Sequence, residues 1–306
     1  MQRNLSIDIL KIVMAFLVVG LHGRIFLDYS YSMYYLFVQG FTRLAVPTFL
    51  IISGYYFYDI QTKETYHQWI KRLFYLYAIW TIIYSPCWFV WSYRVLLPLF
   101  LGYWHLWYLI GALYAFVLVW WMRRLSPSIQ TGMMITCALI GLFLQYNYNY
   151  GFTHQLDFLY RFGNRIYMNG LFQCLPFILM GYLIRRFSLD KKKMNEWLWL
   201  AVALLYFVAE VAINYRYNGK DFDLLFNLYL LCPVLFLFCL NRKIPSNNKT
   251  LALYSTGIYL THAGFLIYLR KYVFLTNTPY IFVCFVLSVI VTFLLIKLKK
   301  KFKYIL

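Results

Sequence analysis

The chain has 306 residues, of which 63% are hydrophobic and only 13% are charged. Soluble domains carry about 25% charged residues, so this composition excludes a soluble domain and indicates a protein whose solvent is the lipid bilayer. The formal net charge of +19 would suit a nucleic-acid-binding protein, but the basic residues fall in short runs between apolar stretches. We therefore expect the lipid bilayer as a partner and no nucleic acid.

Ten apolar runs follow one another along the chain, separated by short polar segments. A helix needs about 20 apolar residues to cross the hydrocarbon core of a bilayer, and backbone groups that face lipid must be paired within the helix. Each run is therefore predicted to be a transmembrane helix. The runs are 8–27, 35–58, 69–92, 105–122, 131–147, 167–185, 196–214, 224–240, 251–272 and 279–297. The predicted fold is all-α, a polytopic bundle of about ten transmembrane helices. We expect one integral-membrane domain over residues 1–306, with no appended soluble domain.

The distribution of Lys and Arg predicts the orientation of the bundle. With the N-terminus in the cytoplasm, the inner segments collect most of the basic residues, including Arg123, Arg124, Arg185, Arg186 and the C-terminal lysines. This asymmetry agrees with the positive-inside rule. An even number of helices returns the chain to the side on which it began, so both termini are expected in the cytoplasm.

The first run carries three ionisable side chains, Asp8, Lys11 and His22. In a helix the three share one face, because three and eleven residues are close to whole numbers of turns. Ionisable groups at bilayer depth are costly and usually mark function, so this face is a candidate polar stripe. The structural alternative is an Asp8–Lys11 pair that reaches the inner membrane edge and a histidine that serves only packing.

Arg43 and His22 are predicted to lie at similar depths. Arg43 is about eight residues into the second run and His22 about six residues below the outer end of the first, which matches their depths to within a turn. The two side chains could therefore face each other across a short hairpin. Alternatively, Arg43 is a structural partner for backbone carbonyls.

Two further histidines are expected in the outer half of the bundle. His105 lies among aromatic residues at the start of the fourth run, where it is either an interfacial belt residue or a functional one. His262 lies past the middle of the ninth run, three residues after Tyr259. We expect no carboxylate to join these histidines within a helix. Zinc motifs have closer ligand spacing, so no metal site is predicted. The six cysteines include no C-x-x-C pair and are typical of core residues.

Lys71 and Arg72 open the third run on the inner side. Two adjacent cations at a cytoplasmic helix end could bind phosphate groups. The alternative interpretation is ordinary topology charge, which composition alone favours.

Five segments, in chain order, resemble the membrane-bound acyltransferase-3 family, which includes polysaccharide and antigen O-acetyltransferases. They are RNLSIDILKIVMAFLVVGLH (3–22), TRLAVPTFLIISGYYF (42–57), YWHLWYL (103–109), GLFQCLPFILMGYLI (170–184) and STGIYLTH (255–262). Many members open the third helix with Arg-x-x-Arg, whereas this chain has Lys71-Arg72 followed by Leu-Phe-Tyr.

The resemblance implies a ten-helix enzyme of a bacterial plasma (inner) membrane. Such an enzyme takes acetyl from cytoplasmic acetyl-CoA and places it on a hydroxyl of an extracytoplasmic glycan, glycolipid or related acceptor. Acetyl-CoA is then a donor substrate, and no permanently bound cofactor is expected. His22 matches the family's essential histidine.

Each candidate residue has an expected role in such a reaction. His22 would act as general base or would accept the acetyl group itself, and Arg43 would stabilise the oxyanion. His105 and His262 are second-rank candidates for orienting the acceptor or transferring a proton, and Tyr259 is a further second-rank acceptor residue. Lys71 and Arg72 would bind the donor's phosphates, and Asp8 would tune Lys11 or the entrance. The alternatives are a transporter or flippase of a polysaccharide precursor and a non-catalytic assembly subunit.

Overall fold

The computed structural model describes residues 3–89, 96–156, 158, 161–217 and 220–306. Within these residues the regular structure is helical, apart from a short antiparallel pairing of β1 (Arg3–Asn4) with β2 (Pro245–Ser246). The prediction of an all-α fold is confirmed.

The helices follow the apolar runs along the chain. The α-helices are α1 (Leu5–Gly23), α2 (Tyr31–Val38), α3 (Ala45–Phe57), α4 (Lys63–Ile83), α5 (Ser85–Trp88), α6 (Leu96–Leu101), α7 (Trp107–Met122), α8 (Pro127–Tyr150), α10 (Leu175–Arg186), α11 (Glu196–Tyr217), α12 (Leu228–Asn241), α13 (Thr250–Tyr268) and α14 (Asn277–Leu298). The shorter turns are the 3₁₀ turns η1 (Phe41–Leu44), η3 (Trp104–Leu106), η4 (His154–Leu156), η5 (Gly163–Ile166), η7 (Leu189–Lys191) and η8 (Leu269–Lys271), and the π-helical turn η6 (Gly170–Cys174).

Several of these helices are long and apolar enough to cross a membrane. Within the described ranges six segments meet this requirement by length and composition: Leu5–Gly23, Tyr31–Phe57, Trp104–Met122, Pro127–Tyr150, Glu196–Tyr217 and Asn277–Leu298. The chain is therefore a multi-pass membrane protein. Ten crossings and cytoplasmic termini stay predictions.

The second predicted helix, 35–58, is wrong as a single continuous helix. The chain leaves the helical conformation at Gly40, which has φ −110° and ψ −96°, and then forms the 3₁₀ turn η1 before α3 begins. A Cβ at Gly40 would collide with the carbonyl oxygen of Leu36. Only glycine fits this break, and the break places Arg43 on a turn between two helices.

The predicted start of the third helix is also wrong. α4 begins at Lys63, where the Thr62 side chain accepts a hydrogen bond from the Thr65 N–H and caps the first turn. Lys71 and Arg72 therefore lie about 12 Å along the helix and do not open it.

The described residues group into two compact units. Unit 1 comprises Met1–Phe49, Asn195–Gly219 and Val234–Leu306, and unit 2 comprises Leu50–Met194 and Lys220–Pro233. Each unit is assembled from separate stretches of the chain, so no single cut separates them. The single domain over residues 1–306 stays a prediction.

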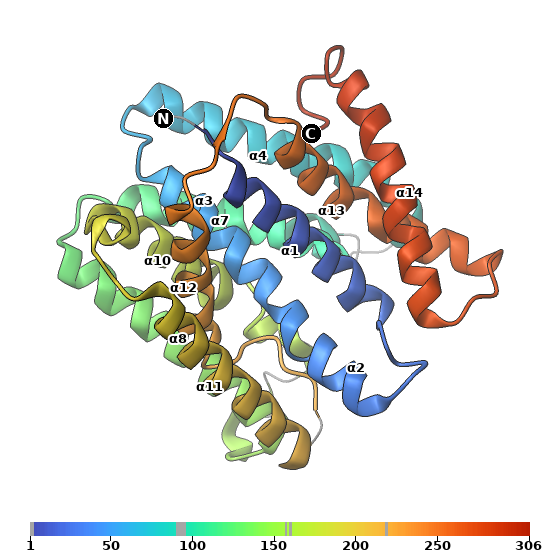
Figure 1. Cartoon of the computed structure of the whole chain (residues 1–306), viewed down its shortest axis with the longest axis horizontal. Coiled ribbons are helices and arrows are strands. Elements are labelled where there is room, and N and C mark those ends of the chain that lie inside the picture. The colour runs from blue at the N-terminus through green and yellow to red at the C-terminus, as the bar shows by residue number, and fades with distance from the viewer. Residues whose placement is uncertain (1–2, 90–95, 157, 159–160, 218–219) are drawn as a thin grey trace. The chain divides into compact units, whose positions relative to one another are not determined.

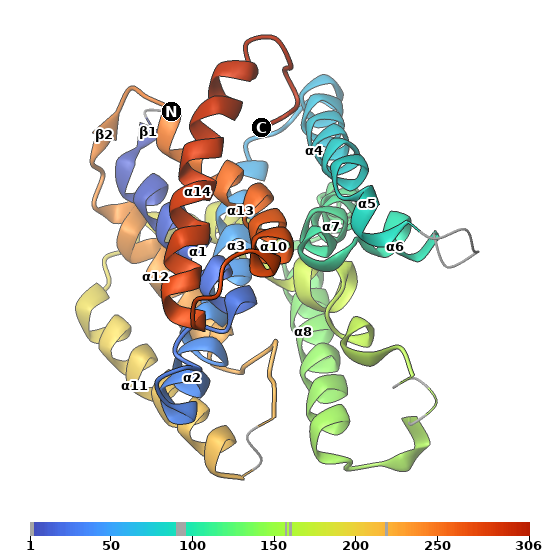
Figure 2. The ribbon, with the colours of Figure 1, turned by 90° about the vertical axis from the view of Figure 1, so that its right-hand side faces the viewer.

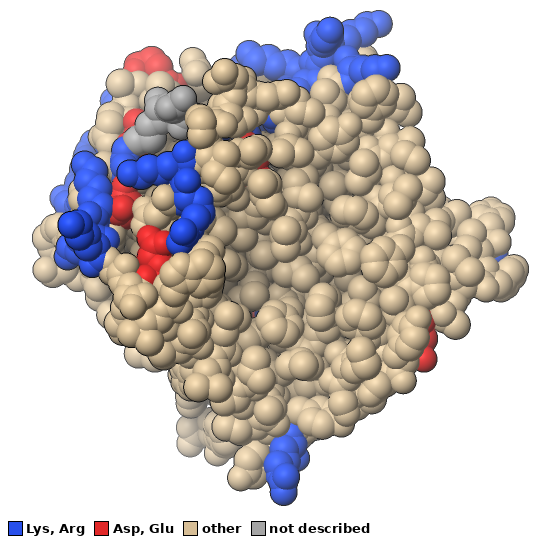
Figure 3. Space-filling view, viewed as in Figure 1, with Lys and Arg blue, Asp and Glu red and all other residues tan. Residues whose placement is uncertain are grey.

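Three long helices pack against one another in unit 1. Figures 1 and 2 show α1, α13 and α14 side by side. Gly257 of α13 faces the side chain of Thr292 on α14, which leaves no room for a Cβ at position 257. Figure 3 shows Lys and Arg side chains gathered where α14 ends and none over its middle. An apolar middle with a basic end is typical of a membrane-spanning helix.

Unit 2 contains close contacts between helix backbones. A Cβ at Gly54 of α3 would meet the backbone of Ile178, and a Cβ at Gly181 of α10 would meet the carbonyl oxygen of Ile51. These glycines lie in the two segments with the letters SGYY and MGYL. Small residues that let two helices approach closely are a common packing device in membranes.

Candidate functional site

His22 and His262 lie against each other in unit 1. The imidazole of His22, in the last turn of α1, stacks on that of His262 in α13, with ring centroids 5.3 Å apart and an interplanar angle of 28°. α1 ends at Gly23, capped by Arg24 in the left-handed conformation with φ 58°. His22 is therefore nearer to the helix end than the predicted six residues.

The partner histidine is fully buried and its orientation is fixed. His262 is 0% exposed, and its Nδ1 lies 3.2 Å from the carbonyl oxygen of Ile258. A carbonyl can only accept, so this hydrogen bond places the proton of neutral His262 on Nδ1. Its Nε2 then carries a lone pair. Tyr259, also buried, has its ring centroid 6.0 Å from that of His262.

Arg43 comes close to the histidine pair. The turn η1, which carries Arg43, packs against α1. The guanidinium of Arg43 interacts electrostatically with His22. One guanidinium nitrogen, Nη2, donates to Oε1 of the buried Gln39. The structure thus brings together His22, Arg43 and His262, as their predicted depths suggested. Their chemical roles stay predictions.

A buried carboxylate lies in the same unit, and sequence reasoning missed it. Glu210 of α11 is 8% exposed, although α11 is one of the apolar membrane spans. The expectation that no carboxylate joins the histidines within a helix stays a prediction, but it passed over Glu210 as a buried carboxylate of this unit. The signal was present, because Glu210 falls inside the predicted run 196–214.

The inner part of the predicted stripe on α1 has a partner that was not predicted from the sequence. α1 is uninterrupted from Leu5 to Gly23, so Asp8, Lys11 and His22 share one face as predicted. Asp8 forms a two-point ion pair with Arg3, with Nε–Oδ2 and Nη2–Oδ1 distances of 2.5 and 2.9 Å. The predicted tuning of Lys11 or of the entrance by Asp8 stays a prediction.

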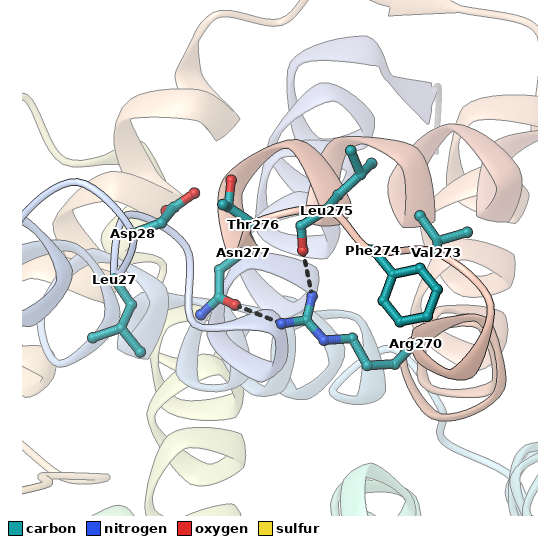
Figure 4. A pocket seen from close by; sticks show the side chains of 8 residues that line it. All are labelled: Leu27, Asp28, Arg270, Val273, Phe274, Leu275, Thr276 and Asn277. Atoms are coloured by element: carbon teal, nitrogen blue, oxygen red, sulfur yellow. Dashed lines mark hydrogen bonds between the residues drawn. The ribbon is translucent and has the colours of Figure 1, made fainter.

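A surface pocket of about 500 Å³ lies beyond the end of α1 that carries His22. Figure 4 shows Arg270 donating to the Leu275 carbonyl and to Asn277 Oδ1, with Phe274 next to Arg270 and Asp28 farther away, near Thr276. The Asn277 side chain in turn lies 3.5 Å from the carbonyl oxygen of Arg24, two residues after His22. The pocket therefore opens at the same end of unit 1 as the histidine pair.

Asp28 anchors the wall of this pocket. Its two carboxylate oxygens accept hydrogen bonds from the Thr278 N–H at 3.0 Å and the Thr278 hydroxyl at 2.5 Å. Desolvation opposes ionisation, but these hydrogen bonds outweigh it and lower the pKa of Asp28 below its usual value. The ionised carboxylate therefore ties the segment after α1 to the start of α14.

Comparison with known protein families matches a model described as an acyltransferase domain to residues 4–297. The chain belongs to the acyltransferase-3 family. The comparisons with curated proteins and with solved structures found no match. The resemblance drawn from the five segments is confirmed, and the chain is a membrane acyltransferase. This membership gives no support to a transporter or a flippase.

The other candidate residues of this acyltransferase lie in unit 2. His105, in η3, is 1% exposed and packs edge-on against Tyr84 with ring centroids 5.0 Å apart. Such burial does not fit an interfacial belt residue. Lys71 and Arg72 are exposed on α4, and the Lys71 ammonium lies 5.9 Å from the ring centroid of Tyr75. Their roles stay predictions.

Metal-ligating side chains do not converge in the described ranges, where no group of three or more His, Cys, Asp or Glu residues could hold a metal ion. The six cysteines carry free thiols. The groups that the structure places beside His22 are the imidazole of His262 and the guanidinium of Arg43.

Proposed function

We propose that this acyltransferase moves an acetyl group from cytoplasmic acetyl-CoA to a hydroxyl of an extracytoplasmic glycan or glycolipid, with His22 at the reaction centre. The observation that carries the proposal is the stacked pair His22–His262, with Arg43 beside it, at one end of an apolar three-helix assembly. An enzyme of this family needs a base or nucleophile of this kind, because a hydroxyl is a poor nucleophile on its own.

His22 acts as general base in the simplest form of the reaction. Its imidazole removes the hydroxyl proton while the oxygen attacks the thioester carbonyl. The C–S bond then breaks, and the departing CoA thiolate receives the proton. In the two-step form the His22 nitrogen attacks the thioester carbonyl, and the C–S bond breaks as CoA leaves as the thiolate. The acetyl-imidazole then passes the acetyl group to the hydroxyl, whose proton goes to the thiolate. Both forms require His22 to be unprotonated at the start.

Arg43 supplies positive charge where negative charge develops. The thioester oxygen becomes an oxyanion as the tetrahedral intermediate forms, and a fixed guanidinium in an apolar site stabilises it strongly. His262, Tyr259 and His105 are kept as candidates for orienting the acceptor. The proton of His262 on Nδ1 leaves its Nε2 able to accept a hydrogen bond from a hydroxyl.

The donor approaches from the cytoplasm in this proposal. The nucleotide end of acetyl-CoA carries several negative charges and cannot enter lipid, so it stays at the membrane surface near Lys71 and Arg72. Only the pantetheine arm and the thioester travel inward. The proposal includes ten crossings, cytoplasmic termini and a bacterial plasma membrane, and the basic end of α14 supports the side chosen for the C-terminus.

This function is tested by measuring the transfer of labelled acetyl from one side of a membrane to an acceptor on the other side. Purified protein is reconstituted into vesicles made from membranes of the source strain with its own copy of this chain deleted, and [¹⁴C]acetyl-CoA is supplied on the cytoplasmic side only. We expect alkali-labile label on glycan or glycolipid exposed at the opposite side.

The matched control contains His22→Ala protein at the same density. Equal labelling with this variant, or movement of unmodified glycan without labelling, would contradict the proposal. The second result would instead indicate a carrier.

A further inference from the structure

Glu210 is a carboxylate that the proposed reaction does not yet use. It is 8% exposed and lies in the middle of an apolar span, where an ionisable side chain costs several kcal/mol unless it is paired. Asp8 and Glu210 are the acidic side chains buried among the described residues, and Asp8 is already paired with Arg3. The energetic cost of Glu210 calls for a cationic partner within unit 1.

The buried face of α11 shows which element Glu210 lies against. Ala203, Phe207, Glu210, Val211 and Asn214 are buried, at spacings that repeat with the helical period, while the rest of the helix is largely exposed. This face therefore packs inward, and α11 contacts α2.

Three contacts fix the level of Glu210 along α2 and η1. The rings of Phe207 and Phe41 lie 5.4 Å apart. A Cβ on Gly40 would lie 3.3 Å from Val211 Cγ2. Further along, the rings of Tyr215 and Tyr35 lie 5.1 Å apart. The two segments thus run antiparallel, and Glu210 falls at the level of Phe41 and Gly40.

Arg43 presents its guanidinium at this same level. Its Nη2 reaches back to Gln39, the residue before Gly40, so the side chain runs alongside the helix break. Gln39 is a neutral acceptor, so the hydrogen bond to it does not change the charge of the guanidinium. A half-buried arginine and a buried glutamate brought to one level by the break are expected to form an ion pair.

We propose that Glu210 is the anionic partner of Arg43 and a positioning residue that holds the guanidinium toward His22. The carboxylate accepts hydrogen bonds from guanidinium nitrogens that Gln39 does not use, and this fixes the plane of the guanidinium. Arg43 can then stabilise the oxyanion without reorganising. This inference rests on the proposed acetyl transfer for its catalytic part, but the pairing itself does not depend on any activity.

Glu196 offers a matched control on the same helix. It begins α11, about 21 Å from Glu210, and its Oε2 lies 2.6 Å from Nη2 of Arg242. Glu196→Gln therefore removes a carboxylate from an arginine on α11 without touching the level of Arg43.

The experiment is a double-mutant cycle of Arg43→Gln and Glu210→Gln, with Glu210→Asp and Glu196→Gln alongside. Each protein is purified, its melting temperature is measured, and its rate of [¹⁴C]acetyl transfer to membranes of the deletion strain is expressed per folded molecule. We expect Glu210→Gln to lower kcat about 10- to 100-fold with the KM for acetyl-CoA unchanged, Glu210→Asp to recover part of the rate, and Glu196→Gln to leave kcat unchanged. The double variant should be no slower than Arg43→Gln alone, because the two residues act as one unit.

Three results would overturn the inference. Additive losses of rate in the double variant, a Glu210→Gln protein with wild-type kcat, or additive losses of melting temperature would each show that the residues are not paired for this role. If Glu210→Gln fails to fold, Glu210→Asp and its combination with Arg43→Gln carry the same cycle. The wild-type protein could prove inactive while the melting temperatures of the single and double variants still show coupling. That result would overturn the proposed function and support the ion pair.

Discussion

Ionisable side chains lie at different places along the helices of the two units. In unit 1, Arg43 and Glu210 lie within membrane spans and His22 in the last turn of another, all on elements packed inside the unit. In unit 2 the arginines at the ends of α7 and α10 bind neighbouring segments. Arg123 Nη1 donates to the carbonyl of Ile60 at 3.1 Å, and Arg186 Nη1 donates to Gln130 Oε1 at 2.6 Å.

The two arrangements use the same residue types for different purposes. A guanidinium at a helix end can satisfy carbonyls that the helix leaves unpaired, which is a structural task. A guanidinium or imidazole inside an apolar span gains nothing comparable for stability and persists where chemistry needs it. The difference teaches that placement within an apolar span, more than residue type, distinguishes the residues proposed for chemistry from those that serve packing.

The largest expected effect contrasts two arginines. Arg43→Gln removes the charge that stabilises the oxyanion, so we expect acetyl transfer to fall about 100-fold or more. Arg186→Gln removes the same charge from a helix end and should change the rate less than about threefold. Rates of [¹⁴C]acetyl transfer per folded molecule measure both. Equal losses of rate in Arg43→Gln and Arg186→Gln would contradict the distinction drawn between the arginines of the two units.

The next effect concerns glycines of unit 2. Gly181→Ala forces a Cβ into the backbone of α3, which cannot move aside as a flexible side chain could, and should cost about 1–3 kcal/mol or prevent folding. Gly132→Ala on α8 meets nothing within 4 Å and should leave stability unchanged or slightly higher. Thermal unfolding in detergent compares the two. A Gly181→Ala protein that melts like wild type would show that α3 and α10 are not in backbone contact.

A smaller effect is expected at the proposed donor contacts. Lys71→Ala/Arg72→Ala removes two exposed cations from α4 and should raise the KM for acetyl-CoA about tenfold while changing kcat less. Steady-state kinetics with varied acetyl-CoA give both constants. An unchanged KM would return these residues to the role of topology charge.

The smallest effect is at the pocket beyond α1. Because the folded-state pKa of Asp28 lies below its unfolded value, its ionised form stabilises the fold at neutral pH, and this contribution is lost as the pH falls through the folded pKa. Asp28→Asn should therefore lower the melting temperature slightly at pH 7. The corresponding loss in the free energy of unfolding should be less than about 1 kcal/mol, because the group is exposed. The difference should vanish once the pH lies below the folded-state pKa. A difference that grows on acidification would contradict the hydrogen-bonded carboxylate.

Periodicity and composition predicted the features that depend on one helix at a time. The all-α fold follows from the apolar runs, and the shared face of Asp8, Lys11 and His22 follows from an uninterrupted α1. The helix break before Arg43 could not be predicted in the same way. A glycine within an apolar run is often tolerated in a helix, and the clash at Leu36 appears only in three dimensions.

Features that depend on packing between helices were harder to predict. Glu210 was visible as one charge inside an apolar run, but its burial depends on which face of α11 meets α2. The start of α4 was missed because Lys63 to Gln68 are too polar to count toward an apolar run. The cap at Thr62 and the acidic residue Glu64 are nevertheless ordinary signals of a helix start.

The most direct test of the account is the activity of His22→Ala in folded form. The variant should melt close to wild type, because His22 is half-buried in the last turn of α1, and should lose acetyl transfer by a factor of about 100 or more. The measurement is alkali-labile [¹⁴C]acetate on extracytoplasmic glycan, normalised to folded protein. A folded His22→Ala protein that transfers acetate at the wild-type rate would contradict the assignment of His22 as the reaction centre.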